Sequence, residues 1–283
     1  MIKNDFSDLN GKVAVLTGGG GVIGKALATG MSRSGITVVI LDISPERGAA
    51  AAEEVAAVTG GKLFGFGADA TNKESLIKVR EQINKEVGQI DILINCAGGN
   101  KPTATTGKEQ VRAGETNLQD TFFGLDINGF DDVFALNFKG TILPTMVFTE
   151  EMVKRGKGCV LNISSMNAFR PLTKIPAYSA AKASINNFTQ WLAVHLAPAG
   201  VRVNAIAPGF LLTNQNRFLL TDEKTGEMTP RGAKIINATP MGRYAEPEEM
   251  VGTMLYLLSD NLAGFVTGVV VPIDGGFSAY SGV

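Results

Sequence analysis

Short apolar runs alternate with longer segments of mixed polarity along most of the chain. Continuous apolar runs bounded by turn residues are typical of buried strands, and strands that alternate with helices form a parallel sheet. The pattern therefore predicts an α/β fold, with its first helix over residues 22–33 and a later helix over residues 177–198. The predicted strands are Lys12–Thr17, Thr37–Leu41, Lys62–Phe66, Ile90–Ile94, Cys159–Ile163, Val201–Ile206 and Phe265–Val271.

Two segments interrupt this alternation, residues 99–129 after the fourth strand and residues 209–245 after the sixth. Both are rich in Thr, Asn, Gly and charged side chains. Loops that follow the carboxyl ends of parallel strands stand over the ligand crevice of a doubly wound sheet. We expect these two loops to recognise a substrate, although a pair of solvated surface excursions would have the same composition.

Composition narrows the class of protein. The 283 residues are 45% hydrophobic, enough for a sizeable core, and we expect one domain over residues 1–283. A net charge of −1 without a basic run argues against nucleic-acid or anionic-membrane partners. The chain has no uninterrupted apolar segment of about 18 residues, and its start lacks the features of a secretory signal, so we expect a cytoplasmic protein.

The two cysteines and the single histidine give no pattern of metal ligands. Cys96 and Cys159 fall in or beside predicted central strands, where small buried thiols are common. His195 has no second histidine to pair with, so we expect a packing or subunit-contact residue. No metal site is expected.

The glycine-rich turn after the first strand predicts a phosphate site. Gly18, Gly19, Gly20, Gly21 and Gly24 separate that strand from the first helix. Glycines let the backbone turn sharply and approach a pyrophosphate, and the helix amino terminus then faces the anion. A flexible turn is the alternative reading. The residues expected at this site are Gly18, Gly20, Gly21, Val22, Ile23 and Gly24.

Asp42 ends the second strand, eighteen residues after Gly24. A carboxylate there can accept hydrogen bonds from the adenosine ribose of a dinucleotide and repels a 2′-phosphate. Because neither Ile43 nor Ser44 is an arginine, the sequence favours NAD over NADP. Asp69, after the third strand, is expected near the adenine together with Ala70, although turn aspartates are common at strand ends.

Tyr178 and Lys182 lie four residues apart, and Ser165 lies thirteen residues before the tyrosine. Residues four apart share one face of a helix, so the ammonium would lie beside the phenol. A free phenol has a pKa of about 10, and a neighbouring cation lowers it toward neutrality. Ser165, just past a buried strand, would donate a hydrogen bond to the substrate oxygen. The alternative is an ordinary amphipathic helix.

These motifs resemble the short-chain dehydrogenase/reductase family from Lys12 to the carboxyl terminus. The resemblance implies a seven-stranded Rossmann sheet in a dinucleotide-binding and catalytic domain, usually assembled as a homotetramer. It also implies Tyr178 as general acid/base, Lys182 as ligand of the nicotinamide ribose, Ser165 as carbonyl-orienting group and Asn137 as holder of a relay water. Val22 replaces a glycine of the family turn. Further cofactor residues expected from the resemblance are Asn95, Ala97, Gly98, Pro208 and Gly209.

A narrower resemblance, in residues 164–178 and 274–283, is to the branch of that family that interconverts D-fructuronate and D-mannonate. A sugar acid needs a cation for its carboxylate and polar groups for its hydroxyls. Reduction of another keto-sugar, polyol or ketoacyl compound, and a non-catalytic NAD-binding sensor or scaffold, are the alternatives. The expected substrate residues are Asn100, Lys101, Ser165, Asn167, Arg170, Tyr178 and Arg217, in a loop that also holds Asn214, Gln215 and Asn216.

Overall fold

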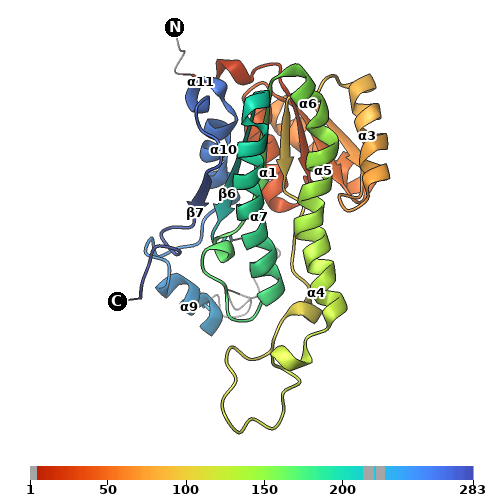
Figure 1. The fold of residues 1–283 in the computed structure, drawn as a ribbon. Helices are drawn as coiled ribbons and strands as arrows, with labels where there is room; N and C mark the ends of the chain where they lie inside the picture. The colour runs from red at the N-terminus through yellow and green to blue at the C-terminus, as the bar shows by residue number, and fades with distance from the viewer. Residues whose placement is uncertain (1–4, 213–219, 221–226, 283) are drawn as a thin grey trace.

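The computed structural model describes residues 5–212, 220 and 227–282. Its centre is a seven-stranded sheet in the order β3-β2-β1-β4-β5-β6-β7, with every neighbouring pair parallel (Figure 1). The expected doubly wound Rossmann fold is confirmed. The strands are β1 Val13–Thr17, β2 Thr37–Asp42, β3 Leu63–Gly67, β4 Ile92–Asn95, β5 Gly158–Ile163, β6 Val201–Pro208 and β7 Val270–Ile273.

The seventh strand begins at Val270, so the prediction of a strand from Phe265 is wrong. Phe265 is fully exposed, and Gly268 has a φ of +82°, which a strand residue does not adopt. The Asn204 side chain donates to the Val266 carbonyl and accepts from the Val269 amide. These bonds hold residues 265–269 as a turn against β6, although their apolar composition resembles a strand.

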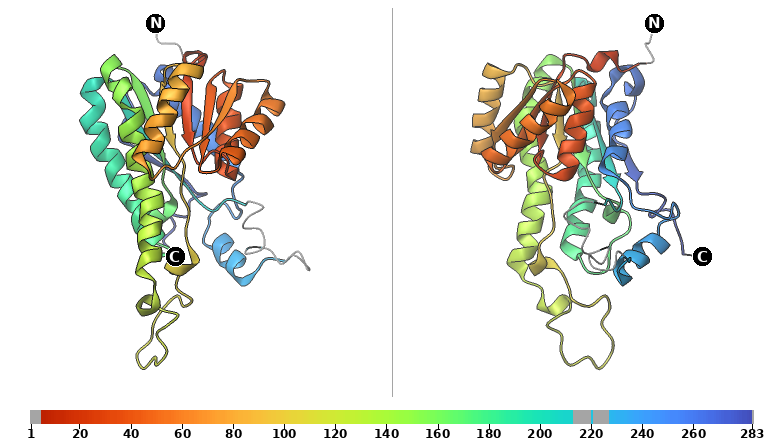
Figure 2. Two further views of the ribbon diagram at one scale, coloured as in Figure 1. Left: turned by 90° about the vertical axis from the view of Figure 1, so that its right-hand side faces the viewer. Right: turned by 180° about the vertical axis from the view of Figure 1, so that it is seen from behind.

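Helices cover both faces of the sheet, as the apolar strand residues require (Figure 2). Leu16 and its neighbours pack on one face against α1, α2 and α10, whereas Val15 and its neighbours pack on the other against α3, α5 and α7. Alternate residues of one strand therefore supply two cores. The helices are α1 Val22–Arg33, α2 Pro45–Thr59, α3 Lys73–Glu86, α4 Ile127–Phe134, α5 Gly140–Phe148, α6 Glu150–Arg155, α7 Pro176–Leu196, α9 Pro230–Asn237, α10 Val251–Leu258 and α11 Asp260–Ala263.

Both long interruptions contain local structure. Residues 99–129 include short 3₁₀ turns at Pro102–Ala104 and Phe122–Gly124 and project from the body of the molecule before α4 begins (Figures 1 and 2). The Thr106 amide donates to the Lys174 carbonyl and ties this segment to the loop before α7. The second interruption carries α9. Within the described residues, no helix has the length and apolar character needed to span a bilayer.

Candidate active site

The glycine turn borders a cavity of about 420 Å³ at the carboxyl ends of β1 to β4. Gly18 has a φ of +65°, and a β-carbon there would lie 2.7 Å from the Ala97 α-carbon. A β-carbon on Gly24 would lie 2.6 Å from the Gly19 α-carbon. Only glycine fits at these two positions, since side chains would collide with backbone. The amino terminus of α1 faces the same cavity, so the residues present fit a bound pyrophosphate.

Most expected cofactor residues lie in this cavity wall, including Val22, which does not close it. Gly20 instead lies against Asp42: a β-carbon there would be 2.5 Å from the carboxylate. Asn95 is not among the lining residues. Its side-chain amide donates to Thr145 and Asn162 inside the sheet, so it positions strands and does not face the cavity. The expected residues in the wall are Gly18, Gly21, Val22, Ile23, Gly24, Asp42, Asp69, Ala70, Ala97 and Gly98.

The carboxylates of Asp42 and Asp69 have different hydrogen-bond and ion-pair partners within the protein. Asp42 is buried, accepts from the Ser44 amide at 3.3 Å, and lies 3.6 Å from the Arg47 guanidinium. Asp69 accepts from the Thr71 amide and hydroxyl at 2.8 and 2.7 Å, so it also stabilises its own turn. Sequence reasoning considered only the two positions after Asp42 and missed Arg47, which the first turn of α2 brings back to it.

A second cleft, of about 280 Å³, adjoins the first, because Ile23, Cys96 and Gly98 line both. Its wall brings together Ser165 from the end of β5, Tyr178 and Lys182 from α7, and Pro208 and Gly209 from the end of β6. Phe210 and Leu211 also line it and were not predicted, although they directly follow Pro208-Gly209. The spacing of Ser165, Tyr178 and Lys182 thus places all three side chains in one cleft.

Lys182 is buried without a carboxylate partner among the described residues. Its ammonium donates to the Ile163 carbonyl at 2.8 Å and lies 5.6 Å from the centre of the Tyr178 ring. Burial lowers its pKa to about 8, and the electrostatic interaction with Cys96 opposes this shift only in part. A lysine with this pKa exchanges protons near neutrality.

The expected lowering of the Tyr178 pKa is wrong for the protein alone. Burial of the phenol raises its pKa above 10, and the hydrogen bond with Ser165 opposes this only in part. The reason is geometric, since Lys182 directs its ammonium to the Ile163 carbonyl. Ser165 and Tyr178 line the same cleft, as a shared contact with one substrate oxygen would require.

Asn137 lies in a π-helical turn, Ala135–Lys139, that joins α4 to α5. Its amide donates to the carbonyls of Gly99 and Val133 at 2.7 and 2.8 Å and accepts from the Gly99 amide. A β-carbon on Gly98 would lie 2.7 Å from the Asn137 side-chain oxygen and 3.2 Å from the Lys182 ammonium. Asn137 and Lys182 therefore both lie beside Gly98, and the π turn agrees with the frequent occurrence of such turns at functional sites.

The expected substrate residues have different surroundings. Asn167 is buried beside Ser165, and its side-chain oxygen has no hydrogen-bond partner among the described residues. Asn100 donates to Thr105, and Lys101 pairs with Asp132. Arg170 is exposed at the rim of the loop. Arg217, like Asn214 to Asn216, lies outside the described residues.

The expected buried thiol is found at Cys159, whereas Cys96 is only partly buried at the junction of the two cavities. Burial raises its pKa to about 11, with Lys182 opposing the shift. The thiol is therefore neutral at physiological pH. No group of three or more His, Cys, Asp or Glu side chains arranged for a metal ion occurs within the described part of the chain.

Comparison with known proteins agrees with this geometry. The profile of the short chain dehydrogenase family matches residues 12–224. The uncharacterised oxidoreductase UxuB of Bacillus subtilis is 49% identical over 276 residues, which are 98% of each protein. A crystal structure of a proposed D-mannonate oxidoreductase from Haemophilus influenzae with bound NAD is 48% identical, with a TM-score of 0.92, and covers 98% of this chain and 99% of that one.

A more distant relative acts, by its name, on another class of substrate. The 3-oxoacyl-[acyl-carrier-protein] reductase of Aquifex aeolicus is 34% identical over 268 residues, covering 95% of this chain and 98% of that protein. The match to the family over most of the chain, together with the glycine turn and the clustered Ser165, Tyr178 and Lys182, shows that this chain belongs to the short-chain dehydrogenase/reductase family of oxidoreductases.

Proposed function

We propose that the protein interconverts D-fructuronate and D-mannonate with NAD as cofactor. The observation that carries the proposal is the cleft holding Ser165, Tyr178 and Lys182, which opens directly from the glycine-lined cavity. A substrate carbonyl in this cleft would lie next to a nicotinamide in the larger cavity. The activity proposed for the Haemophilus relative, at 48% identity over nearly the whole chain, supports the choice of substrate.

The side chains of the cleft have separable roles in this reaction. When bound, the reduced dinucleotide supplies a hydride to the substrate carbonyl carbon. Tyr178 donates its proton to the carbonyl oxygen, so negative charge does not accumulate there. Ser165 orients the carbonyl by a hydrogen bond. Lys182 binds the nicotinamide ribose and, with a pKa of about 8, returns a proton to the phenol, with Asn137 holding the relay water.

Asp42 supports NAD over NADP. Its buried carboxylate lies at the end of β2 in the cavity wall, where it can accept bonds from ribose hydroxyls and repel a 2′-phosphate. The NAD bound to the Haemophilus relative agrees with this preference. Arg47, 3.6 Å from Asp42, offsets part of the repulsion. We therefore propose a preference for NAD and not complete exclusion of NADP.

The decisive experiment is steady-state oxidation of NADH and of NADPH in the presence of D-fructuronate, followed by nicotinamide absorbance. We expect D-fructuronate with NADH to give the highest kcat/KM. Equal or faster turnover of gluconate-type keto acids or ketoacyl compounds would instead support the second candidate, another keto-sugar, polyol or ketoacyl reductase, which the Aquifex relative favours. A failure to turn over any carbonyl compound would indicate a non-catalytic NAD-binding scaffold.

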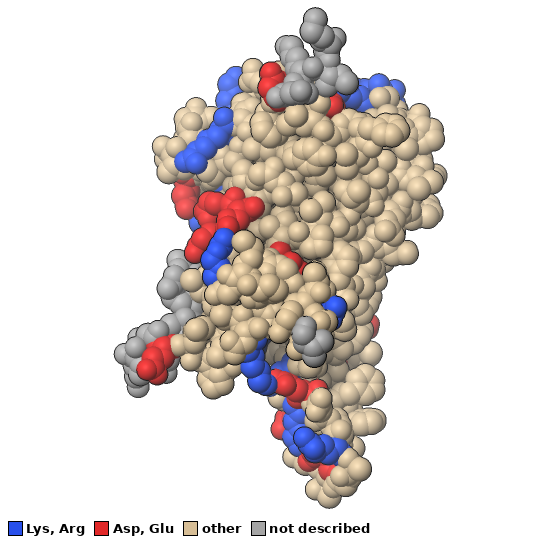
Figure 3. Space-filling view, turned by 90° about the vertical axis from the view of Figure 1, so that its left-hand side faces the viewer, with Lys and Arg blue, Asp and Glu red and all other residues tan. Residues whose placement is uncertain are grey.

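We also propose a homotetramer. Trp191 and Val194 on α7 are 58% and 78% exposed, and Phe265 before β7 is fully exposed. The side of the molecule with α10 and β7 presents a broad upper area almost without charged side chains (Figure 3). Two separate apolar surfaces are what an assembly with two kinds of interface needs. Light scattering coupled to gel filtration would test this, and a monomer at micromolar concentration would overturn it.

A further inference from the structure

A third cavity, of about 390 Å³, lies beside the proposed catalytic cleft. Phe210 lines both spaces, so the two adjoin. One wall is the loop Leu172–Ile175, which connects Ser165 to Tyr178, and another is α9. Neither the glycine turn nor the dinucleotide cavity contributes to it.

The charges around this cavity do not balance. Its charged lining residues are Lys174, Arg231, Lys234 and Glu109. Lys234 and Glu109 pair with each other at 3.1 Å. Within the described part of the chain, neither Lys174 nor Arg231 has an ion-pair partner, in contrast to Lys101, which pairs with Asp132. The cavity therefore has two cations available for an anionic ligand.

The main chain at Lys174 is fixed, which suits a recognition residue. Its carbonyl accepts a hydrogen bond from the Thr106 amide at 2.9 Å, and α7 begins two residues later at Pro176. Lys174 is half-buried, and Arg231 is an exposed residue in the first turn of α9, on another wall of the cavity. Two cations on separate elements can contact one carboxylate from two sides.

The proposed substrate has its keto group next to a terminal hydroxymethyl group and its carboxylate at the other end of the carbon chain. With the carbonyl against Tyr178, the carboxylate must lie in a neighbouring space. We propose that Lys174 and Arg231 bind the substrate carboxylate in this third cavity and thereby select sugar acids over neutral keto-sugars. This inference rests on the proposed function, because it takes the substrate orientation from the site of reduction.

The test compares Lys174→Met and Arg231→Met with the wild-type enzyme, since methionine keeps an apolar stem and removes the charge. We expect each variant to raise the KM for D-fructuronate about 10-fold or more, because a charge-assisted hydrogen bond is lost. The kcat should change by less than about 3-fold, since the carbonyl site is intact. Lys174→Arg, which restores the charge, should recover most of the affinity. Lys85→Met, at an exposed position of α3, is the matched control.

Inhibition by D-mannonate and by D-mannitol gives a second readout, because D-mannitol lacks the carboxylate. The two methionine variants should weaken inhibition by D-mannonate and leave inhibition by D-mannitol unchanged. Equal weakening for both compounds would overturn the inference, since it would indicate a general disturbance of the cleft.

The outcomes separate this inference from the proposed function. Wild-type turnover of D-fructuronate with an unchanged KM in both methionine variants overturns the inference alone. If the wild-type enzyme reduces 5-keto-D-gluconate but not D-fructuronate, the proposed substrate is wrong, and a raised KM for 5-keto-D-gluconate in the variants still supports the subsite. If neither sugar acid is reduced, both proposals are wrong.

Discussion

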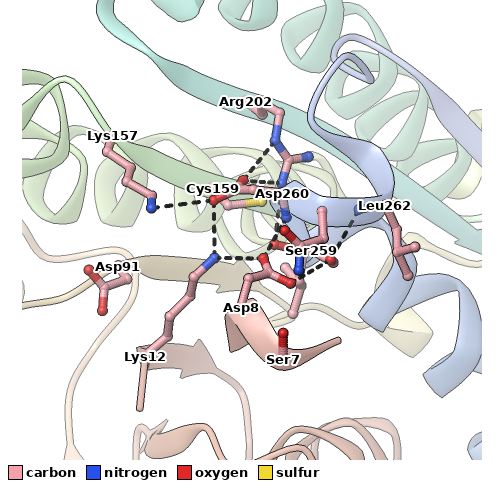
Figure 4. Close-up of polar contacts among 12 residues, drawn as sticks. Ser7, Asp8, Lys12, Asp91, Lys157, Cys159, Arg202, Ser259, Asp260 and Leu262 are labelled. Atoms are coloured by element: carbon pink, nitrogen blue, oxygen red, sulfur yellow. Dashed lines mark hydrogen bonds and ion pairs between the residues drawn. The ribbon is translucent and has the colours of Figure 1, made fainter. Parts of the chain in front are cut away.

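Charged side chains at the amino ends of the strands are paired with opposite charges, whereas the lysine of the proposed catalytic cleft at the carboxyl ends is not. At the amino ends of the strands, Asp260 forms ion pairs with the guanidinium of Arg202 at 2.9 Å and with the ammonium of Lys12 at 3.2 Å (Figure 4). Asp8 also pairs with Lys12 and accepts from the Ser259 hydroxyl at 2.7 Å. The network ties β1, β6 and the start of α11 to the amino-terminal segment, and its cations have carboxylate partners.

At the carboxyl ends of β5 and in α7, Asn167 and Lys182 lack such partners within the described residues. In the described part of the chain, the buried Lys182 ammonium donates only to a backbone carbonyl, and the Asn167 side-chain oxygen accepts no hydrogen bond. A paired buried charge holds neighbouring elements in place, whereas an unpaired one keeps a shifted pKa available for chemistry. The difference suggests that the amino end supports the fold and the carboxyl end carries the function, which substitutions at the two ends can test.

Tyr178→Phe should have the largest effect. Removing the hydroxyl removes the proposed proton donor while keeping the ring, so we expect kcat to fall by about 10²–10⁴-fold. NADH binding, measured by fluorescence titration, should change little. Retention of wild-type turnover would eliminate Tyr178 as the acid.

Lys182→Met should lower kcat by about 10²-fold, because the proton supply and the ribose contact are both lost. The pKa of Lys182 is lowered to about 8, so the lysine is protonated below that pH and neutral above it. The rate of carbonyl reduction should therefore fall as pH rises through about 8 in the wild type. The same descending limb in the variant would assign it to another group.

Asp42→Ala should shift cofactor preference. Removing the carboxylate deletes its bonds to ribose and its repulsion of a 2′-phosphate, and leaves Arg47 free to contact that phosphate. We expect the ratio of kcat/KM for NADH to that for NADPH to fall by about 10-fold. Asp69→Ala is a useful comparison, because Asp69 already bonds to Thr71. An equal shift in both variants would argue against a specific role for Asp42.

Asp260→Asn should instead affect stability and leave kcat nearly unchanged. Loss of the Asp260 charge weakens its ion pairs with Arg202 and Lys12. Because the Asp260 side chain is about one-third exposed, we expect the free energy of unfolding to fall by only about 1–3 kcal/mol. Asp132→Asn breaks only the exposed pair with Lys101 and should cost less than about 1 kcal/mol. Urea denaturation of both variants would measure the contrast, and equal costs would contradict the assignment of a structural role to the amino-end network.

The same network should contribute less to the free energy of unfolding in acid. Burial acts to raise the pKa of Asp8, but the hydrogen bonds from Ser259 and Asp260 and the charge of Lys12 outweigh it, so the folded-state pKa lies below 3.8. The pKa of Asp260 is lowered in the same way, against burial, by Arg202 and Lys12. The network therefore stabilises the fold above pH 3.8. This contribution is lost as the pH falls through the lowered folded-state pKa values of Asp8 and Asp260. The difference in unfolding free energy between wild type and Asp260→Asn should narrow below that pH.

Much of the fold and of the proposed site could be predicted from local patterns. The glycine turn before residue 22 and the apolar strand runs determined the first β-α unit, because glycine freedom and strand burial act over a few residues. The four-residue spacing of Tyr178 and Lys182 placed them on one face of α7. A strand was wrongly predicted to start at Phe265 because the apolar residues there resemble a strand. Their turn is instead held by hydrogen bonds to the side chain of Asn204, which is distant in sequence.

Only the tertiary structure decided the electrostatics. The sequence determined which groups are present and which share a local face, but a pKa depends on burial and on partners from other elements. Thus Lys182 bonds to Ile163 and leaves the phenol pKa raised, and Arg47 turns back to Asp42. Lys174 and Arg231, fifty-seven positions apart, meet at one cavity for the same reason: long-range packing sets their distance, and no local spacing encodes it.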